Sequence, residues 1–74
     1  MKYRHKPLIV EATQWFPGKE ISGVYAGTPG HYYVVTIHAQ RAFLEAGDWV
    51  ITEPDNIHHY PCKDSIFQAG YEPV

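Results

Sequence analysis

The sequence predicts a small, mainly β domain (β or α+β) spanning residues 1–74, with an antiparallel sheet that is curled or barrel-like. Turn-forming residues recur about every 8–12 residues, as in small antiparallel folds. The segments between them are rich in β-branched and aromatic residues, which favour strands. Glycines and a proline between residues 21 and 30 argue against a helix in that segment. We therefore expect at most one short helical turn, near the C-terminus.

The strongest strand signal covers residues 31–38, where almost every residue is β-branched or aromatic. Side chains alternate between the two faces of a strand. Alternation therefore divides this segment into two sets: Tyr33, Val35 and Ile37 on one face, and Tyr32, Val34, Thr36 and His38 on the other.

Further strands are expected over residues 8–13, 41–44, 49–52 and 57–60, with at most a short strand at 24–25. Pro7 begins the first of these strands, which closes on Trp15, and Pro61 stops the last because proline has no N–H group to donate. Turns are expected near residues 39–40, at 45–48 with Gly47 at positive φ, and at 53–56. Asp64 or Ser65 is a candidate cap for a helical turn over 65–68 that ends at Gly70.

Composition excludes several classes of protein. Eleven aromatic residues argue against disorder, and the lone Cys62 excludes an intrachain disulfide scaffold. No apolar run approaches about 18 residues, so we expect no membrane span. The basic start is not followed by an apolar segment and does not resemble a signal peptide. A cytoplasmic protein is the resulting expectation.

Charge is distributed unevenly along the chain. Residues 1–41 contain five Lys or Arg and two Asp or Glu, whereas residues 42–74 contain one Lys and six Asp or Glu. One interpretation is that the two halves face each other and partly neutralise. The other interpretation is that the basic end of the chain binds an acidic partner, or that an acidic face of the chain binds a basic partner. We expect no nucleic-acid partner, because so few cations would neutralise about three phosphates and bind weakly.

The C-terminal half contains a distinctive series: residues 45–51 (EAGDWVI), residues 60–67 (YPCKDSIF) and a terminal YEPV. Together with the opening MKYR and the later VEA and QW, this series resembles a family of short phage and prophage proteins. The family pattern reads approximately "PGDW-I-I", then "YPCKPDIF", then "YE". Ala46 and Asp64 depart from it, as does the Gly- and Pro-rich segment 17–30. The resemblance implies a phage or prophage product made inside a bacterium, and implies no particular activity.

The physical interpretation of this series is structural. Gly47 and Asp48 form a turn in which the carboxylate accepts backbone N–H groups. Cys62 is a small buried residue beside a proline. Four large aromatic residues have a spacing that suits packing over one small core: Trp49, Tyr60, Phe67 and Tyr71.

Five histidines raise the question of a metal site. The order Gly47, Pro54, Asn56 and His59 is similar to the second motif of cupins, with His59 as the candidate ligand. The first cupin motif is missing, and a transition-metal site needs further ligands converging from other strands. Adjacent His58 and His59 point to opposite faces of a strand, so at most one could join such a site. We expect no cofactor, with His59 the sole candidate ligand.

No enzyme signature is present. A Cys62–His59 dyad lacks a third orienting group, and the glycines at 23, 27 and 30 do not follow the P-loop pattern. The sequence therefore predicts a non-enzymatic binding or accessory protein with a protein partner in the host cytoplasm, as a monomer or a homodimer. The candidate contact residues are Tyr32, Glu53, Asp55 and His58. The alternatives are a minimal cupin-like metal or small-molecule binder and a phage structural or assembly component.

Overall fold

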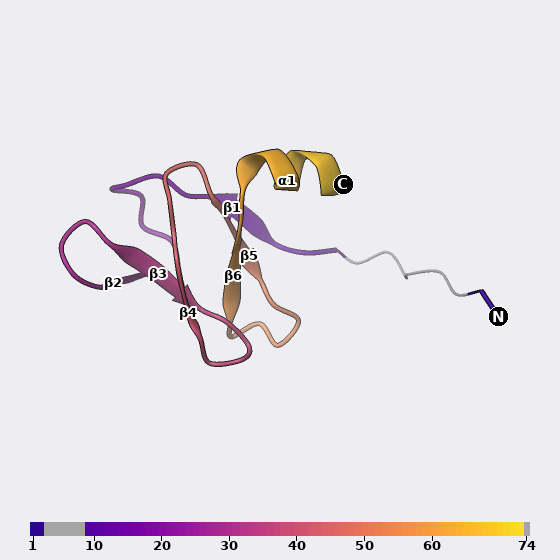
Figure 1. The fold of residues 1–74 in the computed structure, drawn as a ribbon, viewed down its shortest axis with the longest axis horizontal. Helices are drawn as coiled ribbons and strands as arrows, with labels where there is room; N and C mark the ends of the chain where they lie inside the picture. Colours follow the sequence, from indigo (N-terminus) through magenta and orange to yellow (C-terminus); the bar gives the residue numbers. More distant parts are fainter. Residues whose placement is uncertain (3–8, 74) are drawn as a thin grey trace.

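The computed structural model describes residues 1–2 and 9–73 and contains two three-stranded antiparallel sheets and one helix (Figure 1). Sheet A has the strand order β1-β5-β6 and sheet B the order β2-β3-β4. The elements are β1 (Ala12–Gln14), β2 (Tyr25–Ala26), β3 (Tyr32–Val35), β4 (Arg41–Phe43), β5 (Trp49–Thr52), β6 (His59–Cys62) and α1 (Asp64–Gly70). The mainly β prediction is confirmed, with two open sheets rather than a closed barrel.

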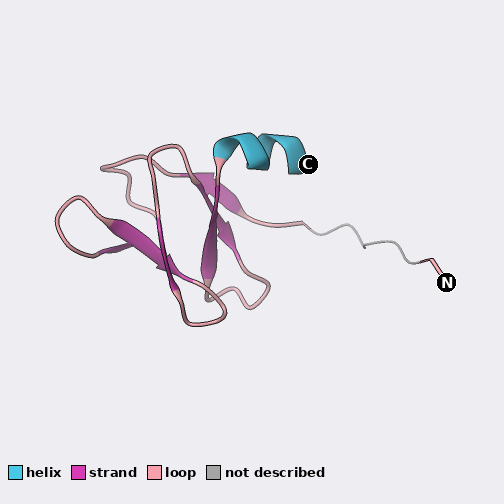
Figure 2. Ribbon diagram, in the orientation of Figure 1, coloured by secondary structure: helices cyan, strands magenta, loops and turns pink. Residues whose placement is uncertain are grey.

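The strands are short, and loops and turns make up much of the chain (Figure 2). Two turns have the backbone conformation that their residues predict. Gly47 has φ +92° before β5, and Asn56 has φ +59° between β5 and β6. No helix within residues 1–2 and 9–73 has the length and apolarity needed to cross a membrane.

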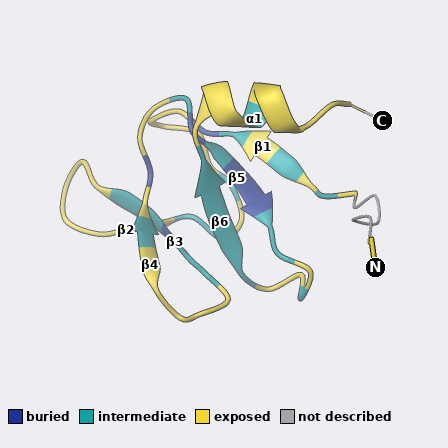
Figure 3. Ribbon diagram, turned by 45° about the vertical axis from the view of Figure 1, so that its right-hand side comes forward, coloured by how far each residue is buried: buried dark blue, intermediate teal, exposed yellow. Residues whose placement is uncertain are grey.

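The core lies where the two sheets face each other. It is built from Trp15, Val34, Leu44 and Val50, and Tyr32 and Ala42 pack against it. β5 is the central strand of sheet A and the most deeply buried strand of the fold (Figure 3). The alternation expected for residues 31–38 is confirmed within β3, because Val34 is buried and Tyr33 lies on the opposite face.

The other face of β5 carries Trp49 and the fully buried Ile51. The Trp49 ring stacks on Phe67 of α1 at 4.0 Å between centroids, and Phe67 stacks on Tyr71 at 4.9 Å. The aromatic residues of the second half thus join α1 to sheet A. They form a stack on the face opposite the Val34 core rather than one shared core.

The prediction that Pro61 stops the last strand is wrong, because β6 contains it opposite Val50. β6 is an edge strand of sheet A, so one side of its backbone needs no partner. The backbone N–H of Glu53 donates to His58 O at 2.9 Å. Because hydrogen-bonded pairs recur at every second position of an antiparallel ladder, Pro61 lies at a position where no N–H is required.

Three strands are shorter than predicted; β4 ends only one residue early, at Phe43, and β1 and β3 differ more. β1 begins at Ala12 because its partner strand, β5, ends at Thr52. The Thr52 N–H donates to Glu11 O at 3.0 Å at this end of the two strands. The predicted start of this strand at Pro7 and Leu8 lies outside the described residues. β3 ends at Val35 because the turn to β4 begins at Thr36, whose N–H donates to Gln40 O at 2.9 Å.

The helix ends at Gly70 as predicted, but it begins one residue before the expected turn. Lys63 is the N-cap residue and makes no capping bond through its side chain. Asp64 does not cap the helix, because its carboxylate accepts the Trp49 indole N–H at 2.8 Å. This bond holds the pKa of Asp64 below its usual value, with a further contribution from Gln68.

Candidate functional site

Sheet B displays a row of aromatic side chains on the face opposite the core. Tyr25, Tyr33 and Phe43 are cross-strand partners on β2, β3 and β4, so strand register alone aligns them. The ring centroids of Tyr25 and Tyr33 are 5.7 Å apart, and those of Tyr33 and Phe43 are 5.9 Å apart. Tyr25 is 54% exposed and Phe43 is 59% exposed. Three strands therefore contribute one aromatic ring each to a continuous, largely open surface.

Two further side chains flank this row. The Arg41 guanidinium lies 5.0 Å from the centre of the Tyr33 ring, within the range of a cation–π contact. The His31 ring meets Phe43 edge-on at 6.4 Å. We call these five residues the aromatic face: Tyr25, His31, Tyr33, Arg41 and Phe43. The contacts with Arg41 and His31 restrict the rings without covering them.

Three of the predicted contact residues lie in or beside the turn between β5 and β6 and bond within the chain. Glu53 accepts the backbone N–H of Ile37, which ties this turn to the turn between β3 and β4. Asp55 Oδ1 accepts the N–H groups of Ile57 and His58, and Asp55 Oδ2 lies 2.5 Å from His58 Nδ1. The hydrogen bond from the His58 ring, followed by those from the two backbone N–H groups, lowers the pKa of Asp55 to about 2.

Tyr32, the fourth predicted contact residue, faces the core. Its ring lies 5.2 Å from that of Trp15, and the residue is half-buried. The structure therefore brings Glu53, Asp55 and His58 together and places Tyr32 on another face. Their role in binding a partner stays a prediction, and each of the four already has an internal structural role.

The residues around His59 bear on the candidate metal site. Among the described residues, no three His, Cys, Asp or Glu side chains gather where they could hold a metal ion. The two adjacent histidines have different neighbours: the His58 ring contacts Asp55, and the His59 ring lies against Gly23. The residues around His59 therefore do not form a cupin-like metal centre within the part of the chain that is described.

The Cys62–His59 pair has the wrong geometry for a nucleophilic dyad. The two residues are three positions apart in β6, so their side chains lie on opposite faces of the strand. The Cys62 thiol instead donates weakly to Lys63 O at 3.7 Å. Burial raises the pKa of Cys62, with a smaller effect of the Asp48 charge, and this favours the thiol over the reactive thiolate.

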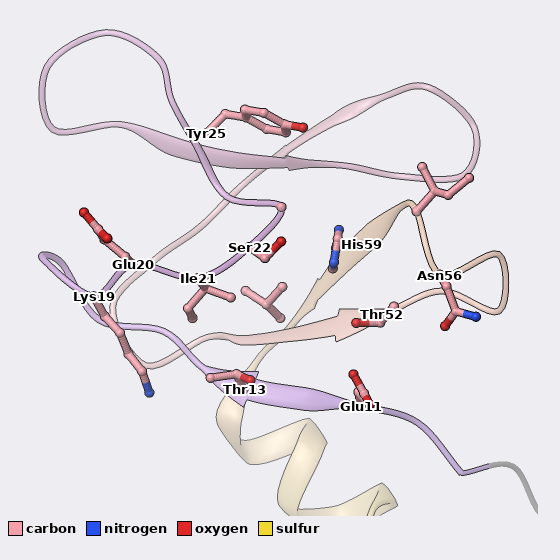
Figure 4. A pocket seen from close by; sticks show the side chains of 13 residues that line it. Glu11, Thr13, Lys19, Glu20, Ile21, Ser22, Tyr25, Thr52, Asn56 and His59 are labelled. Carbon is pink, nitrogen blue, oxygen red and sulfur yellow. The ribbon is translucent and has the colours of Figure 1, made fainter.

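A second surface feature is a hollow of about 610 Å³ between sheet A and the segment 19–25 (Figure 4). β1, β5 and β6 provide its floor, where Thr52 and His59 are cross-strand partners. Tyr25 lies on its far side, and the His59 ring points into it (Figure 4). We call it the polar groove; its polar lining includes Glu11, Thr13, Ser22, Thr52, Asn56 and His59.

Sequence reasoning missed both surfaces in part. Alternation places Tyr33 on the face opposite Val34, but the register that aligns it with Tyr25 and Phe43 joins segments up to 18 positions apart. The aromatic face could have been inferred from the aromatic residues that remain for the surface once the core residues are assigned. For the polar groove, the alternation of Glu11 and Thr13 along the first strand was the available signal.

Comparison of the chain with models of known protein families, with curated proteins and with solved structures found no match.

Proposed function

We propose that this chain is a non-enzymatic binding protein of phage or prophage origin, which contacts a protein partner in the bacterial cytoplasm through its aromatic face. The observation that carries the proposal is the in-register row of Tyr25, Tyr33 and Phe43. The phage origin and the cytoplasmic location are supported by the sequence resemblance of residues 45–51 and 60–67.

Exposed aromatic rings are favourable anchors for a protein partner. Burying a side chain such as Phe43 is worth about 1.5–3 kcal/mol. Tyr and Arg are enriched among the residues that dominate binding energies, and the aromatic face contains two Tyr and one Arg. Each ring of the row contacts a neighbour across the sheet, so we expect less side-chain freedom to be lost on binding than for isolated rings.

Charge favours a protein with an acidic group over a nucleic acid. Arg41 is the one Lys or Arg within the strands of sheet B as they are described, and the chain carries a formal net charge of −2. A single cation supplies too little neutralisation for a phosphate backbone. The same cation beside apolar rings suits a partner segment of apolar residues with one Asp or Glu that reaches Arg41.

Site-specific photo-crosslinking in bacterial cells tests this proposal. A benzophenone amino acid replaces Phe43 in one variant and Ile66 in another; Ile66 is 64% exposed and lies on α1, away from sheet B. We expect one defined protein adduct at position 43 that is missing at position 66. The adduct should weaken at least about tenfold when Arg41→Glu is added, because the charge that faces the acidic group is reversed.

Identical adducts at both positions, or none at position 43, would contradict the proposal. An RNA or DNA adduct at position 43 would assign the aromatic face to nucleic acid instead. A particle protein as the adduct, with the chain present in purified virions, would make this a structural or assembly component. Circular dichroism of each variant checks that the fold is retained.

A further inference from the structure

The polar groove has features of a small-molecule site that are independent of the proposed protein partner. It shares Tyr25 with the aromatic face, whereas its floor belongs to sheet A. Glu11 and Thr13 come from the β1 segment, Thr52 from β5 and His59 from β6. The turn at residues 21–24, closed by a hydrogen bond from Val24 N to Ile21 O at 3.1 Å, forms the wall opposite (Figure 4).

The first feature is the close contact of His59 with Gly23. Gly23 has φ +93°, and a Cβ atom there would lie 2.3 Å from His59 Cε1 and 2.4 Å from Nδ1. The imidazole therefore occupies the space that any other residue would fill. This contact holds one side of the imidazole ring against the backbone. The orientation of the ring in the groove is therefore fixed before a ligand binds.

The second feature is a set of polar side chains that make no hydrogen bond with any other group in residues 1–2 and 9–73. Within the described residues, none of the side chains of Glu11, Thr13, Ser22, Thr52, Asn56 or His59 makes a hydrogen bond. Four carboxylates outside the groove are used internally: Glu45, Glu53, Asp55 and Asp64 each accept at least one hydrogen bond. The groove thus keeps its donors and acceptors available.

We propose that the polar groove binds a neutral saccharide. Three hydroxyl groups, an amide, an imidazole and a carboxylate offer both donors and acceptors, which match sugar hydroxyls that donate and accept in turn. Tyr25 is half-exposed and lines the far side of the groove, where its ring offers apolar surface to the C–H groups of a sugar. A volume of about 610 Å³ accommodates one or two sugar rings.

Other ligand classes fit the groove less well. Glu11 and Glu20 oppose an anion such as phosphate. Lys19, the cation at the rim, donates to Gln14 O at the end of β1 at 2.9 Å, so its ammonium is already paired with a backbone carbonyl. A divalent metal lacks a trio of ligands within the described residues. A polyamine is the remaining competitor, because it would pair with the two carboxylates.

Titration of the ¹⁵N-labelled protein followed by NMR tests the proposal. Glucose and N-acetylglucosamine are the probes, with inorganic phosphate and spermidine as competitors for the same groove. We expect saturable shifts at Gly23, Thr52 and His59 with a Kd on the order of millimolar, as suits a single sugar ring in an open groove. The amide of Phe43 should not move, which separates this site from the aromatic face.

Thr52→Val removes a hydroxyl group while keeping the branched shape that suits β5, and Thr28→Val makes the same change in a loop outside the groove. We expect Thr52→Val to weaken sugar binding about three- to tenfold, the value of one hydrogen bond, and Thr28→Val to leave it unchanged. No saturable shift with either sugar up to about 100 mM would overturn the proposal. Binding of phosphate or spermidine instead, or equal effects of both variants, would do so too.

Discussion

The ammonium of Lys63 lies 3.2 Å from Asp48 Oδ1 and so links the end of β6 to the turn that precedes β5. Asp48 is 3% exposed, and its second oxygen accepts the backbone N–H of Glu45 at 2.9 Å. Lys63 also reaches Glu45 Oε2 at 2.8 Å. These ion pairs lie within residues 42–74, so the two oppositely charged halves of the chain do not meet at Lys63. The carboxylate of Asp48 instead organises its own turn.

Replacing Asp48 should therefore destabilise the fold. We expect Asp48→Ala to lower the free energy of unfolding by about 1–3 kcal/mol, because the backbone N–H of Glu45 loses its acceptor and Lys63 loses its buried partner. Glu45→Ala is the matched control, since its carboxylate contacts the same lysine from the surface, where an ion pair contributes little. Urea denaturation measures both. Equal losses would show that the buried position of Asp48 has no special role.

The contact of Gly23 with His59 gives a second test of packing. Gly23→Ala should lower the free energy of unfolding by at least about 2 kcal/mol, because the new methyl group meets the imidazole and the φ of +93° is unfavourable for alanine. Gly18→Ala provides the control for φ alone: Gly18 has φ +90°, and a methyl group there would meet no atom within 4 Å, so we expect about 1 kcal/mol.

Adding His59→Ala to Gly23→Ala should restore the part of the free energy of unfolding by which Gly23→Ala falls below Gly18→Ala. The shortened side chain removes the clash, and only the unfavourable φ remains. A double variant as unstable as Gly23→Ala alone would show that the imidazole is not what excludes a side chain at position 23. The four proteins are compared in one urea series, with equal slopes as the check that unfolding is two-state.

Local signals in the sequence predicted the strands and turns well. β5 over Trp49–Thr52 has the bounds expected from its apolar run between two turn signals, and Gly47 has the predicted positive φ. The exception at Pro61 is instructive. Its effect on a strand depends on whether the strand lies at an edge and on which side its missing N–H points, and both are properties of the assembled sheet.

The candidate surfaces depended on information that local pattern does not contain. The aromatic face needs the register of β3 with β2 and β4, and the polar groove needs Gly23 to meet His59 from 36 positions away. The polar residues of the 53–58 turn were conspicuous in sequence and were interpreted as contact residues. In the structure Glu53 and Asp55 satisfy backbone N–H groups, the usual role of such residues in turns, and their role in binding a partner stays a prediction.

The depressed pKa of Asp55 predicts a loss of stability in acid. Its carboxyl has a pKa of about 2 in the folded protein against an ordinary value of 3.8. As the pH falls, the unfolded chain therefore binds the proton before the folded protein does. The ionised Asp55 stabilises the fold fully above its ordinary pKa, and this contribution is lost as the pH falls toward the pKa of the folded protein. We expect the melting temperature of the wild type to fall more steeply than that of Asp55→Asn between about pH 4 and pH 2.

Carboxyl ¹³C titration by NMR measures the Asp55 pKa directly and separates it from other carboxyl groups. Glu72→Gln is the control, because the Glu72 side chain makes no hydrogen bond within the described residues and its removal should leave the slope unchanged. A midpoint near 3.8 for Asp55, or parallel melting curves for wild type and Asp55→Asn, would contradict the role assigned to the His58 ring and the two backbone N–H groups.

The attachment of α1 through Phe67 and Trp49 gives the last prediction. A seven-residue helix is too short to be stable by itself, and no residue of α1 is fully buried. The stack of Phe67 on Trp49, with ring planes 7° apart, must therefore supply much of the stability of the helix. Phe67→Ala should unfold residues 64–70 and change the near-ultraviolet signal of Trp49 while both sheets persist. Ile66→Ala, at an exposed position of the same helix, should change neither. Amide exchange resolved by residue distinguishes the outcomes, and a helix that stays protected in Phe67→Ala would show that another contact holds it.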